Sequence, residues 1–399
     1  MTLIDYAFYI GLFIYGIDLF GLDNYIILAW VILLAVLRKS DTFYVSRQAW
    51  LLLLFGVLYI IFSGLYESIE TQTIIRILLA PFFGYLMAEN YFLQGGNIKA
   101  GILMIVTGMF LHGALNMIVS LKSGYTVGSV SNFWGGQLTQ TLQGMILTPA
   151  APLFYFGIYD FKNHKLSILT SIMAALSLYF SIVTGRRTLV LIFFALFAIN
   201  IIRSVFVNNS LNYLMRLIFT FSVVLILCVV AYLSDFKGIR TYIEASTFYQ
   251  RAFVVDESEL GASRSQIHGY VISHFLDYIF GGSAPIPYAS FAHNLWLDVL
   301  VVAGIFPMIV LITYSISTIL TLKRFMLCAE IDEGSKVVYF SIFVALIFSF
   351  YVEPVLLGAP HTFISMCIMN GMAHAVTVRA EHNIMIDQEF NYQWLGYIS

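Results

Sequence analysis

The stretch LMRLIFTFSVVLILCVVAYL, residues 214–233, indicates the class of fold. It is 20 residues long, and Arg216 is its one charged residue. A helix of about 20 apolar residues crosses the hydrocarbon core of a bilayer. Comparable runs recur along the 399 residues, of which 60% are hydrophobic and 11% charged, with a mean hydropathy of +0.87. Soluble domains carry roughly 25% charged residues. The runs are continuous rather than alternating, so the sequence predicts an all-α, polytopic transmembrane helical bundle.

About twelve spans are expected along the chain, on the rule of about 20 apolar residues per span. Their positions divide the chain into four parts. They are expected near residues 4–20, 24–37, 48–64, 73–93, 98–120, 138–160, 165–183, 188–206, 214–233, 293–320, 336–357 and 361–378. Residues 1–233 then form an N-terminal bundle, 234–292 a long loop, 293–379 the C-terminal spans and 380–399 a tail. A connection as long as 234–292 is expected to contain helices of its own and to carry function.

Lysines and arginines predict which loops face the cytoplasm. Their bias between alternate loops favours cytoplasmic N- and C-termini. The outer face nevertheless keeps eight of the 20 basic residues. They are Arg76, Lys122, Arg186, Arg187, Lys237, Arg240, Arg251 and Arg264. This exception to the positive-inside rule predicts that something anionic binds on the outer face.

Several classes of site are not expected. The basic residues are scattered among loops, which argues against a nucleic-acid partner. Cys228 and Cys367 lie inside apolar runs and Cys328 in a short loop, so neither a disulfide nor a metal site is expected. Phosphate-loop, metal-ligand and Ser-His-Asp signatures are lacking, and no cofactor is predicted. The start MTLIDYAFYI has no basic region, so the first span is expected to remain a membrane helix.

The turn TGRRT, residues 184–188, is the first candidate for an anion site. A guanidinium group matches phosphate oxygens with two parallel hydrogen bonds. Adjacent helical residues point about 100° apart, so one of Arg186 and Arg187 can bind a ligand while the other anchors the helix. The alternative is that both are interfacial anchors.

The segment SRSQIHGYVISHFLDYIFGG, residues 263–282, is predicted to be a helix in the long loop, capped near Ser263 and ended by Gly281 and Gly282. Arg264 and His268 are four residues apart and share one face. Arg264 is therefore a second candidate for phosphate binding, with a solvated loop arginine as the alternative, and His268 is a candidate for binding substrate. Arg76, at the outer start of the fourth span, is a third.

The tenth span opens with polar residues in HNLWLD, residues 293–298. His293 can accept a proton from, or orient, a reacting hydroxyl, because its pKa lies near working pH; a helix cap is the alternative. Asn294 and Asp298, four residues apart, are expected to brace it or to bind sugar hydroxyls. Trp296 can stack on a sugar ring or anchor the helix in the interface.

Glu353, in FSFYVEPVL, lies near the outer end of the eleventh span, where a carboxylate is costly. Paired with an arginine it would be structural; otherwise it is a candidate for binding acceptor hydroxyls. His361 begins the last span on the same face, and His112 and Asn116 lie in the outer half of the fifth. All of these groups are predicted to meet in one outward-facing cavity.

At these residues the chain resembles bacterial O-antigen polymerases and O-antigen ligases. The resemblance rests on HNLWLDVLVVAGIFP (293–307), on TGRRT, and on Arg264 in the large loop ahead of the HN pair, and covers roughly residues 180–310. The doubled arginine and the Phe306–Pro307 pair depart from the family pattern. The first 170 residues agree only in their hydrophobic spans.

The resemblance implies a glycosyltransferase of the bacterial inner membrane, with 234–292 as its periplasmic loop. Donor and acceptor would be glycans on undecaprenyl diphosphate, among membrane lipids, with a chain-length regulator as an expected partner. Arg187 or Arg186 together with Arg264 would bind the diphosphate, and His293 would assist attack by the acceptor hydroxyl. No metal is implied.

Three activities remain open. A polymerase would join lipid-linked repeat units, which suits many aromatic residues (25 Tyr, 35 Phe) and several outer arginines. A ligase would move the finished chain to lipid A–core. A transporter of a lipid-linked sugar would show repeated halves and charges near mid-membrane, whereas the charges here gather at one face.

Overall fold

The computed structural model describes residues 3–22, 44–66, 68–123, 129–160, 162–206, 211–235, 264–282 and 289–396, with a few isolated positions between these ranges. Most of the predicted span 24–37, most of the loop 234–263 and Ser263 lie outside the described residues. The described chain is mostly helical and has one two-stranded sheet.

Seven of the described helical segments are long and apolar enough to cross a membrane, which fits the predicted all-α polytopic fold. They are Thr71–Leu93 (α4, the π-helical η2 and α5), α6 (Ile98–Lys122), α9 (His164–Val183), α10 (Arg187–Phe206), α11 (Leu211–Leu233), α16 (Ile305–Leu327) and α17 (Glu333–Val352). Two shorter apolar helices, α1 (Leu3–Gly16) and α3 (Arg47–Ser63), and the long α19 (Pro360–Gly396) complete the bundle.

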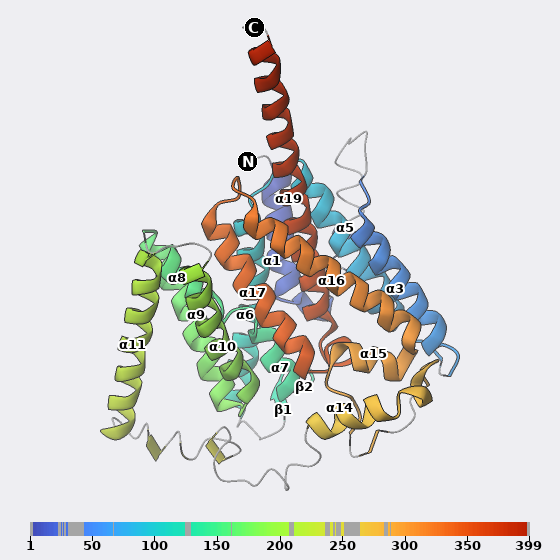
Figure 1. Ribbon diagram of the computed structural model, residues 1–399. Coiled ribbons are helices and arrows are strands. Elements are labelled where there is room, and N and C mark those ends of the chain that lie inside the picture. Colours follow the sequence, from blue (N-terminus) through green and yellow to red (C-terminus); the bar gives the residue numbers. More distant parts are fainter. Residues whose placement is uncertain are drawn as a thin grey trace.

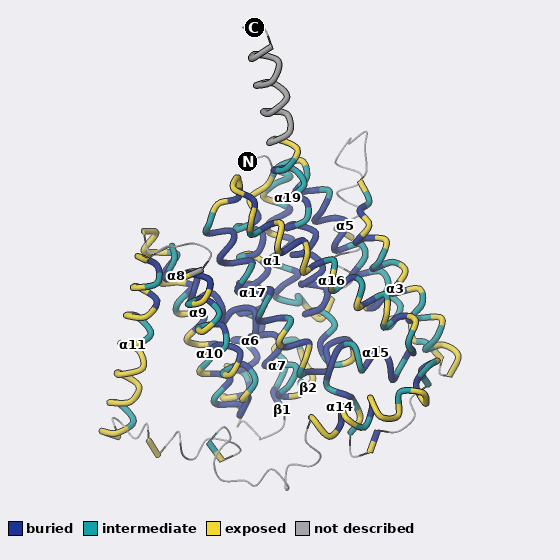
Figure 2. The backbone as a smooth tube through the Cα atoms, viewed as in Figure 1, coloured by how far each residue is buried: buried dark blue, intermediate teal, exposed yellow. Residues whose placement is uncertain are grey.

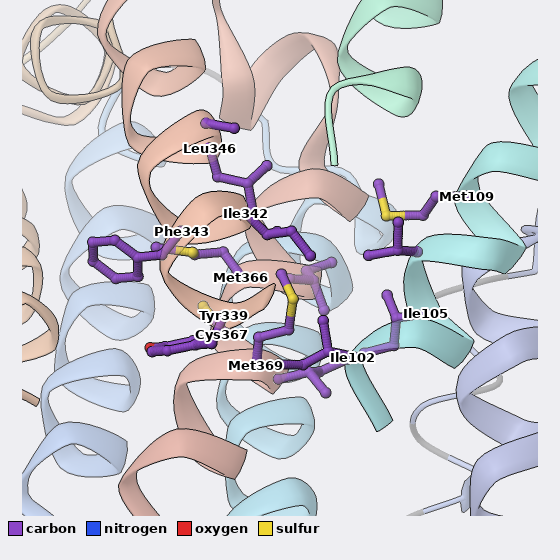
Figure 3. Packing of buried hydrophobic residues seen from close by; sticks show 14 of the residues in the cluster. Ile102, Ile105, Met109, Tyr339, Ile342, Phe343, Leu346, Met366, Cys367 and Met369 are labelled. Carbon is purple, nitrogen blue, oxygen red and sulfur yellow. The ribbon is translucent and has the colours of Figure 1, made fainter. Parts of the chain in front are cut away.

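The core lies where α6, α17 and α19 meet (Figure 3). Ile105 of α6 faces Ile342 and Leu346 of α17, and Met369 of α19 lies between them. These four side chains are buried, as is Met366 of α19. Flexible methionines fill irregular gaps between helices. By contrast, α11 lies at the edge of the molecule (Figure 2), and only 6% of its most apolar window is buried inside the protein.

Two predicted spans are not single helices. The predicted span 138–160 is split into α7 (Gln140–Leu147) and α8 (Leu153–Tyr159) around the segment TPAAP, residues 148–152. Its two prolines lack the amide hydrogen that a continuous helix needs. The predicted span 293–320 is split into α15 (Leu295–Ala303) and α16 at Gly304, whose φ of 87° a helix cannot accommodate.

The β-hairpin and the loop helix lie at one end of the molecule (Figure 1). The hairpin of β1 (Ser129–Ser131) and β2 (Gln137–Thr139) lies there, antiparallel and with Val130 opposite Leu138. The predicted loop helix is also there, as α14 (Arg264–Ser273) followed by the 3-10 turn η6 (Phe275–Tyr278). These elements and α15 surround the end of α17, where the polar candidates meet.

Candidate active site

A buried carboxylate forms the centre of the site. Helix α17 ends at Val352 and Glu353 is extended (φ −135°, ψ 150°), because Pro354 disfavours a helical residue before it. The Glu353 side chain is fully buried. A buried charge is stable only when it is paired and hydrogen-bonded, so its surroundings must supply cations.

Two arginines from distant parts of the chain supply this charge. Arg186 Nη2 lies 2.7 Å from Glu353 Oε1, and Arg264 Nη2 lies 3.3 Å from the same oxygen. Thr188 Oγ1 also donates to this oxygen, at 3.0 Å. The second oxygen, Oε2, has no hydrogen-bond partner among the described residues. Two guanidinium groups around one carboxylate leave a net positive charge, which suits an anionic ligand.

The TGRRT turn separates its two arginines. Gly185 has a φ of 73°, which reverses the chain between α9 and α10. The turn is held by Ser181, whose carbonyl accepts from Arg186 N at 2.8 Å and whose hydroxyl donates to Arg186 O at 2.9 Å. Arg186 is thereby buried against Glu353, whereas Arg187 is the exposed first residue of α10.

A glycine of α7 makes room for the buried arginine. A Cβ added to Gly144 would lie 2.7 Å from Arg186 Nε and 3.2 Å from its Cζ. The guanidinium group therefore lies directly against the α7 backbone. Sequence reasoning missed Gly144, because nothing in the local pattern indicates which helix Arg186 approaches.

His293 precedes α15 in an unusual conformation. Its φ of 55° is left-handed, which is uncommon for a residue other than glycine and is typical of sites held by their surroundings. Asp298 Oδ1 accepts from Ala292 N at 2.7 Å on one side. On the other side, Asn294 Oδ1 caps α15 by accepting from Trp296 N at 3.1 Å, and Asn294 Nδ2 donates to Tyr351 O at 3.1 Å.

Burial and neighbouring charges favour the neutral form of the His293 imidazole. Burial and then the charge of Arg264 lower its pKa below the ordinary histidine value, while the charge of Glu353 acts in the opposite direction. His268 and Arg186 add further lowering. His293 Nδ1 has no hydrogen-bond partner among the described residues. A neutral imidazole beside two cations can accept a proton from a substrate hydroxyl.

Trp296, Asp298 and His268 are the remaining candidates near the site. Trp296 Nε1 donates to Ser315 Oγ of α16 at 3.1 Å, which fits an anchoring role, and Asp298 is buried. His268 on α14 contacts Tyr351 edge to face, with ring centroids 5.9 Å apart. Its Nε2 has no partner within the part of the chain that the structure describes.

The other polar candidates are Arg76, His112, Asn116 and His361. Arg76 is exposed on η2. His112 lies on α6 with Asn116, whose amide donates to Gln143 Oε1 of α7 at 3.1 Å. Among the described residues, Arg76 makes no hydrogen bond or ion pair with Glu353. Across the described ranges, no group of three His, Cys, Asp or Glu side chains is arranged to hold a metal ion.

Neither models of known protein families nor curated proteins match the chain.

Proposed function

We propose that the chain is a metal-independent glycosyltransferase that joins undecaprenyl-diphosphate-linked repeat units at the periplasmic face of the bacterial inner membrane, as an O-antigen polymerase does. The observation that carries the proposal is the meeting of Arg186 and Arg264 at buried Glu353, with His293 in the same electrostatic environment. The resemblance in the segments that bear these residues supports it.

The arginines would stabilise the leaving group. In the transfer, a bond forms between the acceptor oxygen and the anomeric carbon of the donor, and the bond from that carbon to the diphosphate breaks. The diphosphate leaves with the electron pair, so negative charge grows on its oxygens. The side chain of Arg264 is 43% exposed and can reach such a ligand, whereas Arg186 is 10% exposed and is held by Glu353. Cations placed in advance at a developing charge lower the barrier by several kcal/mol.

His293 would receive the proton that the acceptor hydroxyl loses. Its neutral form is favoured by burial and by the nearby guanidinium groups. Once protonated, the imidazolium would stand beside Glu353, whose charge favours the protonated state. In this scheme Glu353 holds the arginines in place, and binding of acceptor hydroxyls is not required of it.

The test is the length distribution of surface glycan in cells. The deletion strain is compared with strains carrying the intact chain, His293→Ala or Arg264→Ala at equal protein level. Polymerase activity predicts lipid A–core that bears a single repeat unit in the deletion and in both variants. His274→Ala is the matched control, because His274 is an exposed histidine of the same loop.

Other outcomes point to other activities. Bare lipid A–core with long chains accumulating on the carrier lipid identifies a ligase. Unchanged glycan ladders in all strains would refute both transferase activities and favour a transporter of a lipid-linked sugar.

A further inference from the structure

A second polar pocket lies at the end of the bundle opposite Glu353. Helix α17 starts at Glu333 and ends beside Glu353, so its start and the preceding end of α16 lie at the far end (Figure 1). There, the start of α3 and the end of α16 enclose a cavity of about 520 Å³. Its lining includes Ser46, Arg47, Gln48, Ser317, Thr321 and Lys323.

The inner wall of this pocket is a fixed hydrogen-bond network. Gln48 Nε2 donates to Thr321 Oγ1 at 2.7 Å and to Ser317 Oγ at 2.9 Å. The hydroxyl of Tyr85 donates to Gln48 Oε1 at 2.6 Å. Gln48 and Thr321 are buried, at 4% and 3% exposure. A rigid polar wall at the end of two apolar helices is suited to a polar ligand.

The rim of the pocket carries unbalanced positive charge. Arg47 and Lys323 are exposed, and neither makes an ion pair with any described residue. The other charges of the pocket are compensated. Arg324 pairs with Glu381, and His374 Nδ1 lies 2.8 Å from the buried Glu89 Oε1. The pocket therefore favours an anion at Arg47 and Lys323.

Exposed apolar side chains continue from the pocket along both helices. Trp50 and Leu54 of α3 are 58% and 47% exposed, and Leu320 and Ile316 of α16 are 55% and 54% exposed. A free anion such as phosphate would leave these surfaces unused. A ligand with a charged head and acyl chains would match both, because basic residues near a membrane surface attract anionic lipids.

We propose that this pocket binds the phosphate headgroup of an anionic membrane lipid, with Arg47 and Lys323 on the phosphate and the acyl chains along α3 and α16. The inference does not depend on the proposed glycosyltransferase activity. It assigns to the far end of the molecule a lipid site that is separate from the cluster at Glu353.

The test uses the purified full-length protein in a neutral detergent, titrated with phosphatidylglycerol and followed by native mass spectrometry. Phosphatidylcholine of the same chain length and inorganic phosphate are the comparison ligands. The double variant Arg47→Gln/Lys323→Gln is expected to bind phosphatidylglycerol at least about tenfold more weakly. Arg47→Lys, which keeps the charge, should retain most of the binding.

The matched control is Lys162→Gln/Lys165→Gln. These exposed lysines lie beside the start of α9, and α9 runs from there to the TGRRT turn, so they are at the same end of the molecule. Unchanged affinity in this control with weakened affinity in the pocket variant supports the site. Equal weakening in both variants would overturn it in favour of general charge attraction. Binding of inorganic phosphate as tight as that of phosphatidylglycerol would overturn the assignment to a lipid.

Discussion

His293 combines a left-handed backbone, an unpaired Nδ1 among the described residues and a lowered pKa. A proton acceptor works only when it is deprotonated. As pH rises through its pKa, His293 loses its proton and the transfer rate should rise. The acid limb of the pH–rate profile is therefore expected below the ordinary histidine value of about 6.5. His293→Ala should lower the rate by about 10²- to 10⁴-fold.

The profile also tests the cause of the shift. Arg264→Gln removes a cation that lowers the pKa of His293, so the acid limb should move to higher pH in addition to any loss of rate. Transfer between lipid-linked substrates in proteoliposomes measures both quantities. An acid limb that keeps its position in Arg264→Gln would contradict the assignment of the proton to His293.

Glu353 supports a prediction about stability. Removing one partner of a buried ion pair costs about 3–5 kcal/mol, because the other charge stays buried without compensation. Glu353→Gln should therefore lower the thermal unfolding temperature in detergent clearly. Glu381→Gln is the control, since it breaks an exposed pair with Arg324 that is worth about 0–1 kcal/mol. Equal effects of the two changes would show that the Glu353 cluster contributes no more than a surface pair.

Single residues show how far sequence could predict this site. TGRRT, His293 and Glu353 could be selected because polar and charged groups are unusual at the ends of apolar spans, and Arg264 because it lies in a predicted loop helix ahead of His293. Which arginine turns inward could not be selected, because the answer depends on the φ of Gly185 and on the space that Gly144 leaves in another helix. The pairing of Glu353 with both arginines likewise depends on long-range packing.

Among the helices, the break at Gly304 between α15 and α16 is a point of contact with the loop segment that follows η6. A Cβ on this residue would lie 2.5 Å from Ile279 O, and the following amide of Ile305 donates to that same oxygen at 2.9 Å. Gly304→Ala should destabilise the protein by more than about 1 kcal/mol, because it combines a positive φ with a backbone clash. It should also increase proteolysis of the loop that carries Arg264.

The matched control for this element is Gly269→Ala. Gly269 belongs to α14, and a Cβ added there meets no atom within 4 Å. Its unfolding temperature should equal that of the unchanged protein or exceed it. A Gly304→Ala variant that is as stable as Gly269→Ala would rule out a structural role for the break.

Hydropathy predicted where helices exist better than where they break. The spans that became α6, α9, α10 and α17 were expected within a few residues of their observed bounds. The breaks at TPAAP and Gly304 were not expected, because their residues are apolar or small and do not interrupt a hydropathy run. A backbone break at membrane depth is tolerated only where other protein groups surround it.

At the scale of the whole molecule, the two ends are expected to face opposite sides of a membrane. Ser273 is exposed at the end of α14, the helix whose first residue, Arg264, contacts Glu353, and Lys165 is exposed near the start of α9 at the far end. In a variant whose native cysteines are replaced, a membrane-impermeant thiol reagent should label Ser273→Cys from the periplasmic side. It should label Lys165→Cys only after the membrane is broken. The reverse pattern would place the cluster in the cytoplasm.

The exposure of helix α11 affects which substitutions the protein can tolerate during evolution. Tyr213 and Leu217, both near its start, are its buried residues among those described. Phe221 stacks on Phe197 of α10 with ring centroids 3.8 Å apart, and most of the other described side chains of α11 are exposed. In a bilayer, the exposed positions of such a helix require hydrophobic side chains but not side chains of a particular shape. Exchanges among Leu, Ile, Val and Phe at its exposed positions should be close to neutral, so the sequence there can change as long as its length and hydropathy are kept. Gly144, Gly185 and Gly304, each tied to a specific neighbour or angle, have no such freedom.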